Sequence, residues 1–370
     1  MKKKVKLKLK YKICLIIMII SLIGGVYLYM SKSSNQTNSY YSQDVKDIFA
    51  EYDINKSLDD IKYSKTIEEM ILNNLFIEKY LDEYVSIDFI ENEVFLEDVN
   101  LFLELGYNAE EINSILILSS LNQEKLKNID YTNLKDFVEF TNFNVSNIDR
   151  YNEFYDNTKY DWDEVITYVN INLDLDFYEI TEVSLDPSNI NVLVNKYNAL
   201  PSDYVPSGMT SLSKHSSYKM VKEAAKAADS LLAAALKDGF EFIPFSTYRS
   251  YTYQETLFNN YSARDGLEAA LTYSAKPGHS EHQTGLAIDI YNPDHFYYTN
   301  ERMGDEDYAW VLKNAHKYGY IVRYPADSED ITGYIEEPWH LRYLGVELAT
   351  SVIESGLTYD EYYDLYLTEY

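Results

Sequence analysis

The stretch GHSEHQTGLAID, which ends at Asp289, concentrates side chains that can bind a metal ion. It holds His279 and His282 in a chain that has only six histidines. Asp289 lies inside the apolar run LAIDI, which is typical of a buried strand. A second stretch, EEPWHLRY, places Glu337 three residues before His340 at the start of another apolar segment.

These residues have the chemistry of a hydrolytic zinc site. His282, Asp289 and His340 are three ligands of kinds that zinc accepts, and a catalytic zinc ion keeps its fourth position for water. Zinc lowers the pKa of that water toward about 7, and a carboxylate such as Glu337 can take its proton as general base. We therefore predict amide hydrolysis. His279 lies three residues before His282 and is not assigned as a ligand. We expect it in a loop at the rim of the pocket.

The elements that must position these side chains follow a change in composition at about Ser184. The sequence predicts a helix over residues 216–237, and a second helix in DEDYAWVLKNAHKYGY. Strands are predicted in FEFIPFSTYRS, TGLAIDIY, IVRYP and EPWHLRYLG. This order predicts an α+β domain over residues 184–370, with a small antiparallel sheet and flanking helices that carry the zinc site.

The combined patterns resemble a known family. S-x-H-x-x-G-x-A-x-D, from Ser280 to Asp289, and E-x-x-H, from Glu337 to His340, look like the zinc signature of VanY-type D-alanyl-D-alanine carboxypeptidases. This family belongs to a wider group with lysostaphin-like peptidases and hedgehog domains. The segments STYRSYTYQ, VNKYNALPSDYVP, IVRYP and ITGY also fit the family. The resemblance covers roughly residues 192–345.

The resemblance implies roles for six residues. It implies that the zinc ligands are His282, Asp289 and His340. It implies Glu337 as catalytic base, Arg249 as stabiliser of charge on the substrate carbonyl, and Ser280 as a substrate contact. Thr247 departs from the family, which usually has glycine before Tyr-Arg, and we expect this departure to alter the shape of the pocket.

The resemblance implies a zinc-dependent carboxypeptidase that removes the C-terminal D-alanine from peptidoglycan stem peptides. An LD-carboxypeptidase that acts on tetrapeptides stays open as an alternative, because both reactions need the same metal and base. A second alternative is a non-catalytic, zinc-containing module that binds the cell wall. A third alternative is an amidase or endopeptidase. A base beside the metal favours an enzyme over a pure binder.

The N-terminal sequence predicts that the chain is attached to a membrane. Residues 1–12 hold seven lysines and no acid, and residues 13–30 form an uncharged apolar run of eighteen residues. Such a run is near the lower limit for a spanning helix, and the lysines predict that residues 1–12 stay in the cytoplasm. The chain after Met30 is then extracellular, on a Gram-positive cell surface. A cleaved signal peptide is the alternative, but bulky residues follow the apolar run instead of a small-x-small site.

Between the anchor and the zinc domain, residues 31–43 have the composition of a flexible tether, and residues 44–183 are predicted to be mostly helical and possibly built of repeats. YNAEEINSIL, FNVSNIDRYNEFY and YDWDEVITYV share an aromatic residue, a polar N-cap and an apolar pattern. This region serves as a spacer, binds an unknown partner, or simply packs on its neighbour. A formal net charge of −28 argues against nucleic acid as a partner.

Overall fold

The structure, a computed structural model, describes residues 40–52, 54, 56–89, 95–113, 140, 142–299 and 302–368. The chain divides into two compact units between Ile166 and Thr167. The predicted anchor over residues 13–30 and most of the predicted tether lie outside the described residues. Within the described part of the chain, no helix has the length and apolarity needed to cross a membrane.

The first unit is built of short helices, as the sequence predicts. Among its described residues the elements are α2 (Gln43–Phe49), η1 (Leu58–Asp60), α3 (Lys65–Leu72), η2 (Glu78–Tyr80), α4 (Leu81–Tyr84), α5 (Phe95–Glu104), η4 (Val145–Asn147), α8 (Ile148–Asn157) and α9 (Trp162–Asn170). The last of these contains the division between the units. Two of the three similar segments begin in the same way. Asn108 and Glu111 exchange side-chain hydrogen bonds with each other's backbone amides, and so do Asp161 and Glu164. These reciprocal caps satisfy amides that a helix start leaves unpaired.

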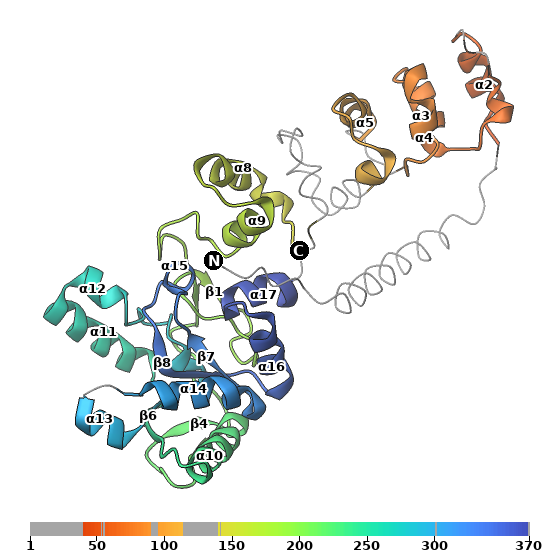
Figure 1. The fold of residues 1–370 in the computed structure, drawn as a ribbon. Helices are drawn as coiled ribbons and strands as arrows, with labels where there is room; N and C mark the ends of the chain where they lie inside the picture. The colour runs from red at the N-terminus through yellow and green to blue at the C-terminus, as the bar shows by residue number, and fades with distance from the viewer. Residues whose placement is uncertain are drawn as a thin grey trace. The chain divides into compact units, whose positions relative to one another are not determined.

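The second unit is mixed α and β, and its centre is a four-stranded sheet (Figure 1). The strands are β5 (Ile243–Ser246), β6 (Ala287–Tyr291), β8 (Glu337–Tyr343) and β7 (Tyr320–Tyr324), in this spatial order. Every neighbouring pair is antiparallel. Two small sheets accompany it: β1 (Glu182–Val183) pairs with β2 (Asn198–Ala199), and β3 (Met209–Ser211) pairs with β4 (Lys219–Val221).

The helices of this unit are α10 (Lys222–Lys237), α11 (Tyr251–Asp265), α12 (Leu267–Leu271), η5 (Glu281–Thr284), α13 (Pro293–Thr299), α14 (Asp305–Asn314), η6 (Ala315–Tyr318), α15 (Glu329–Thr332), α16 (Val346–Ser355) and α17 (Tyr359–Leu367). The prediction that a helix begins at Ser216 was wrong. Residues 219–221 form β4 instead, because their backbone pairs with β3, and α10 begins only at Lys222.

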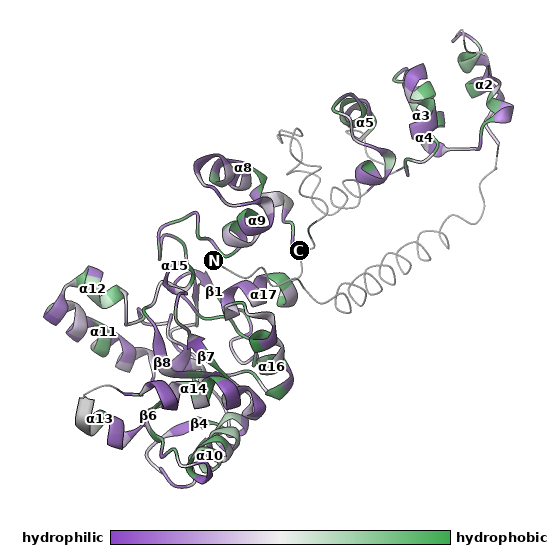
Figure 2. Ribbon diagram, in the orientation of Figure 1, coloured by the Kyte–Doolittle hydropathy of each residue, from purple (hydrophilic) through white to green (hydrophobic). Residues whose placement is uncertain are grey.

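The two faces of the large sheet differ in character because side chains alternate along a strand. Ile288 and Ile290 of β6 and Leu341 of β8 face one core, which α10 and α14 complete. Figure 2 shows apolar and polar residues alternating along α10, and the buried ones include Ala228 and Leu231. The intervening residues on β6, β8 and β7 include four polar or charged, buried side chains, which are Asp289, His340, Arg342 and Arg323. The sheet therefore carries these polar and charged side chains on the face opposite its apolar core.

Candidate active site

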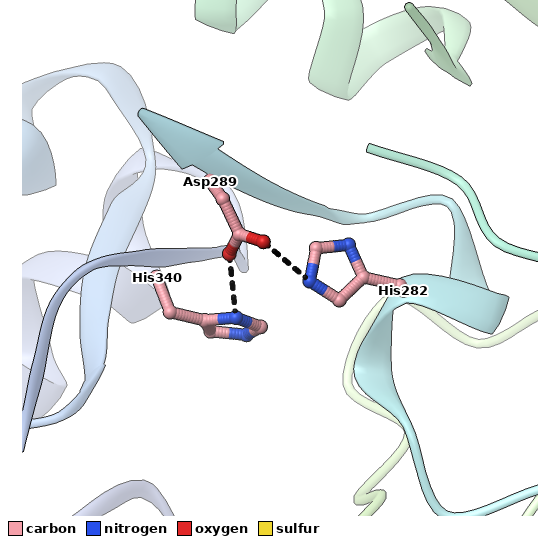
Figure 3. A group of neighbouring side chains, drawn as sticks. All are labelled: His282, Asp289 and His340. Carbon is pink, nitrogen blue, oxygen red and sulfur yellow. Dashed lines mark hydrogen bonds and ion pairs between the residues drawn. The ribbon is translucent and has the colours of Figure 1, made fainter. Parts of the chain in front are cut away.

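Strand register brings two of the predicted ligands together. Asp289 on β6 is paired directly with His340 on β8, so the two side chains leave the same face of the sheet. His282 comes from the short helix η5, which precedes β6 and ends at Gly285. Gly285 has a φ of +70°, a left-handed conformation that glycine adopts without strain. This turn lets the chain enter β6 with His282 beside Asp289 (Figure 3).

The three side chains are close enough to hold one metal ion. Nε2 of His282 lies 3.2 Å from Oδ2 of Asp289, and Nδ1 of His340 lies 3.0 Å from Oδ1 of the same carboxylate. The potential ligand atoms all lie within 4.8 Å of one another. Zinc binds nitrogen and oxygen at about 2.0–2.2 Å, so two ligands of one ion are separated by roughly 3–4 Å. The set of donors and their spacing fit zinc.

Both imidazole rings are fixed through their other nitrogen. Nδ1 of His282 lies 2.6 Å from the carbonyl oxygen of Thr247, and Nε2 of His340 lies 3.2 Å from Oε2 of Glu281. A ring that donates a proton from one nitrogen presents the lone pair of the other, which is how metal-binding histidines are commonly oriented. Thr247 acts here through its backbone, which glycine also has. Thr247 is not among the residues that line the described cavity.

Burial and neighbouring charges set the protonation of these groups. Burial and, to a lesser extent, the nearby Arg249 charge lower the pKa of His282 to about 4. Burial opposes the charged form of His340 as well, but hydrogen bonds with Asp289 and Glu281 outweigh it and raise its pKa to about 9. Asp289 stays ionised, because its interactions with the two histidines hold its pKa well below the usual range despite burial.

Arg249 reaches into the same site. Its Nη2 atom lies 2.8 Å from Nε2 of His282 and donates to Oδ2 of Asp289 at 2.8 Å. Its Nε donates to Ser246, and its Nη1 donates to Gln254. A metal ion held by His282 and Asp289 would share these two ligand atoms with the guanidinium, which also borders the cavity.

Glu337 stands beside this group on β8. Its Oε2 atom lies 3.8 Å from Nδ1 of His340, and its side chain is only 13% exposed. Burial raises its pKa to about 7, with the nearby charge of Asp289 adding to the rise and that of His340 opposing it. A carboxylate with a pKa near neutrality is well matched to take up a proton at neutral pH.

A cavity of about 790 Å³ opens over these residues. Its lining includes Arg249, Ser280 and Glu337, together with the aromatic side chains of Tyr253 and Trp339. The predicted metal ligands, base, arginine and serine thus all border one space. A bound peptide has room there for its scissile amide.

The prediction for His279 was right about the loop but wrong about the pocket rim. It does not lie at the pocket rim but is 6% exposed, and its Nδ1 lies 2.8 Å from the carbonyl oxygen of Asn195. Its ring packs edge-on against Tyr178, with the ring centres 5.0 Å apart. Burial lowers the pKa of His279.

Comparison with known proteins agrees with the site. Residues 217–346 match the family model described as VanY, D-alanyl-D-alanine carboxypeptidase. Over 191 residues the chain is 42% identical to putative carboxypeptidase YodJ of Bacillus subtilis, which covers 50% of this chain and 70% of that protein. The chain belongs to the VanY family.

Two further comparisons found similar proteins. A D-alanyl-D-alanine carboxypeptidase of Enterococcus faecalis is 35% identical over 181 residues, or 46% of this chain and 64% of that protein. The solved structure of LdcB, an LD-carboxypeptidase, is 42% identical, with a TM-score of 0.46 over 50% of this chain and 90% of that one. As a member of the VanY family, the protein is a zinc metallopeptidase.

Sequence reasoning missed Glu281, although it lies between Ser280 and His282 in the VanY-like pattern. Its carboxylate contacts His340 and two arginines, and it is completely buried. The sequence did indicate that a buried acidic partner was needed, because Arg323 and Arg342 interrupt the apolar segments IVRYP and HLRY. Arginines in buried strands require acidic partners.

Proposed function

We propose that this protein hydrolyses the terminal peptide bond of peptidoglycan stem peptides and releases D-alanine. The observation that carries the proposal is the meeting of His282, Asp289 and His340 with Glu337 at the floor of one cavity. When bound to these three ligands, zinc activates water and polarises the scissile carbonyl. Glu337 accepts the proton of the attacking water and returns a proton to the departing amine.

Arg249 and Ser280 complete the proposed machinery. Arg249 supports charge that develops on the carbonyl oxygen, since its guanidinium is anchored by Ser246 and Gln254 and borders the cavity. Ser280 is 5% exposed and lines the same cavity, where it contacts the substrate. Hydrolysis breaks one amide bond and adds one water, so that a pentapeptide yields a tetrapeptide and free D-alanine.

The test is incubation of the purified, zinc-loaded protein with synthetic pentapeptide and tetrapeptide, with products identified by mass. We expect loss of one D-alanine from the pentapeptide. Cleavage of the tetrapeptide alone would identify an LD-carboxypeptidase, and release of soluble muropeptides from intact sacculi would identify an amidase or endopeptidase. Stoichiometric zinc without hydrolysis of any of these would identify a binding module.

We further propose that the protein acts at the outer face of a Gram-positive cell membrane. The support is the order of segments along the sequence: the basic residues 1–12, the apolar residues 13–30 and the polar residues 31–43. In sequence order, the helical region of residues 44–183 follows these segments and precedes a zinc domain of residues 184–370. Stem peptides are exposed to enzymes on that side of the membrane.

A further inference from the structure

A buried ionic network lies directly behind the proposed metal site. Arg323 of β7 and Arg342 of β8 both have side chains that are 0% exposed, and both donate to Oε1 of Glu281, at 2.9 and 2.8 Å. Arg342 also donates to the carbonyl oxygens of Ile190 and Val192. Charges buried this deeply are tolerated only when every one is paired and hydrogen-bonded.

The second carboxylate of the network comes from α17. Asp360 accepts from Nη1 of Arg323 at 2.7 Å and from Nη2 at 3.2 Å, which is a bidentate pair. Asn195 donates to the same carboxylate at 2.8 Å. The ring of Tyr359 lies 5.6 Å from the guanidinium carbons of both arginines. Two consecutive residues of α17 therefore hold the arginine pair in place.

The network ends at His340. Oε1 of Glu281 is held by the two arginines, which leaves Oε2 directed at Nε2 of His340. If Nε2 carries the proton of the neutral ring, then Nδ1 carries the lone pair, and Nδ1 is the atom that lies 3.0 Å from Asp289 at the metal site. The orientation and the tautomer of one ligand thus depend on the position of one buried carboxylate.

We propose that Glu281 and Asp360 are positioning residues for His340, so that α17 stabilises the metal site through the chain of contacts Asp360, Arg323, Glu281 and His340. Asp360 lies beyond residues 217–346, which match the family model, and it touches neither the cavity nor a predicted ligand. The inference rests on the proposed role of His340 as a ligand. It assigns a function to a C-terminal helix that the proposed mechanism does not use.

The test measures zinc affinity in the full chain, purified in detergent, by competition with a chromogenic chelator. Removal of an outer-shell partner of a metal ligand weakens metal binding by about 10- to 100-fold. We expect a loss of this size for Glu281→Gln, and a smaller but measurable loss of about threefold to tenfold for the more distant Asp360→Asn. Thr358→Ala is the matched control, because it removes the N-cap of α17 without touching the arginines, and its zinc affinity should equal that of the parent.

A second measurement separates positioning from general destabilisation. Long-range proton–nitrogen correlation spectra of the histidine rings report which nitrogen carries the proton. In the zinc-loaded parent, the signals that disappear in His340→Gln should show a protonated Nε2, and Asp360→Asn should shift them while circular dichroism shows a folded chain. Should Glu281→Gln fail to fold, Asp360→Asn still decides the question, because it keeps the shape of its side chain.

A folded Asp360→Asn protein with parental zinc affinity and unchanged His340 signals would overturn the inference. So would an equal loss of affinity in Thr358→Ala, because the effect would then come from the helix as a whole. Failure of the parent itself to bind stoichiometric zinc would overturn the inference together with the ligand assignment beneath it. That outcome is recognised without any variant.

Discussion

Glu337 and His340 lie three residues apart on one strand, yet both side chains reach the same site, with Oε2 of Glu337 3.8 Å from Nδ1 of His340. In a regular strand, residues separated by three point to opposite faces. The pairing of β8 with β7 is irregular at this place, because Glu337 pairs with Tyr324 and Leu341 with Val322, so that β8 holds two extra residues. This bulge turns the proposed base toward the proposed ligand, a use of bulges that is common beside active sites.

Removal of either histidine should abolish metal binding and activity together. His282→Ala or His340→Ala leaves the ion with two protein ligands, too few for a stable catalytic zinc site. Metal analysis of the purified variants, beside the parent, measures the effect. His316→Ala is a suitable control, because His316 contacts Thr350 and neither residue lines the cavity. Its variant should keep full zinc. Near-stoichiometric zinc in either ligand variant would show that the assignment is mistaken.

Substitution of Arg249 should reduce catalysis without weakening metal binding. Because its guanidinium shares two ligand atoms with the ion, Arg249→Ala should bind zinc at least as tightly as the parent. Turnover should fall by about 10²- to 10³-fold, the usual cost of losing a group that stabilises charge on the carbonyl oxygen. Zinc titration and kcat on pentapeptide measure the two effects. Parental turnover in this variant would exclude the proposed role.

The rate should depend on pH through Glu337. Burial raises its pKa to about 7, so the base is increasingly protonated, and inactive, as the pH falls below that value. The positive charge of bound zinc shifts this midpoint downward. We expect kcat/KM to rise about tenfold per pH unit on the acid limb and to level off at or below about pH 7. A profile that stays flat down to about pH 4, the ordinary range of a glutamate, with zinc still bound, would argue against a carboxylate base.

Topology is tested by a tag placed after Tyr370. If residues 13–30 span the membrane with the lysines inside, the tag lies outside the cell. External protease added to intact protoplasts should then remove it, while a cytoplasmic marker protein stays whole. Protection of the tag until the protoplasts are lysed would refute the proposed orientation.

The sequence was sufficient to predict which side chains gather at the site, because the rare histidines and the acids near them stand in short, apolar segments. It could not supply the pairing of Asp289 with His340, since register depends on which strands become neighbours. The bulge near Glu337 was equally hidden, because it exists only in the pairing of β8 with β7. Residues 219–221 continue a helical pattern locally, and only the partner strand β3 makes them a strand. The role of Glu281 was not predicted, because its partners Arg323 and Arg342 lie 42 and 61 residues away in the sequence.

The most direct measurement is the activity of Glu337→Gln, with zinc content determined on the same sample. Glutamine keeps the size of the side chain and its hydrogen-bonding capacity but cannot accept a proton from water. Zinc occupancy and substrate affinity should match the parent, while kcat on pentapeptide falls by about 10²- to 10⁴-fold. Hydrolysis within a few-fold of the parent rate would contradict the proposed mechanism, and loss of zinc would instead make Glu337 a ligand and reopen the role of Asp289.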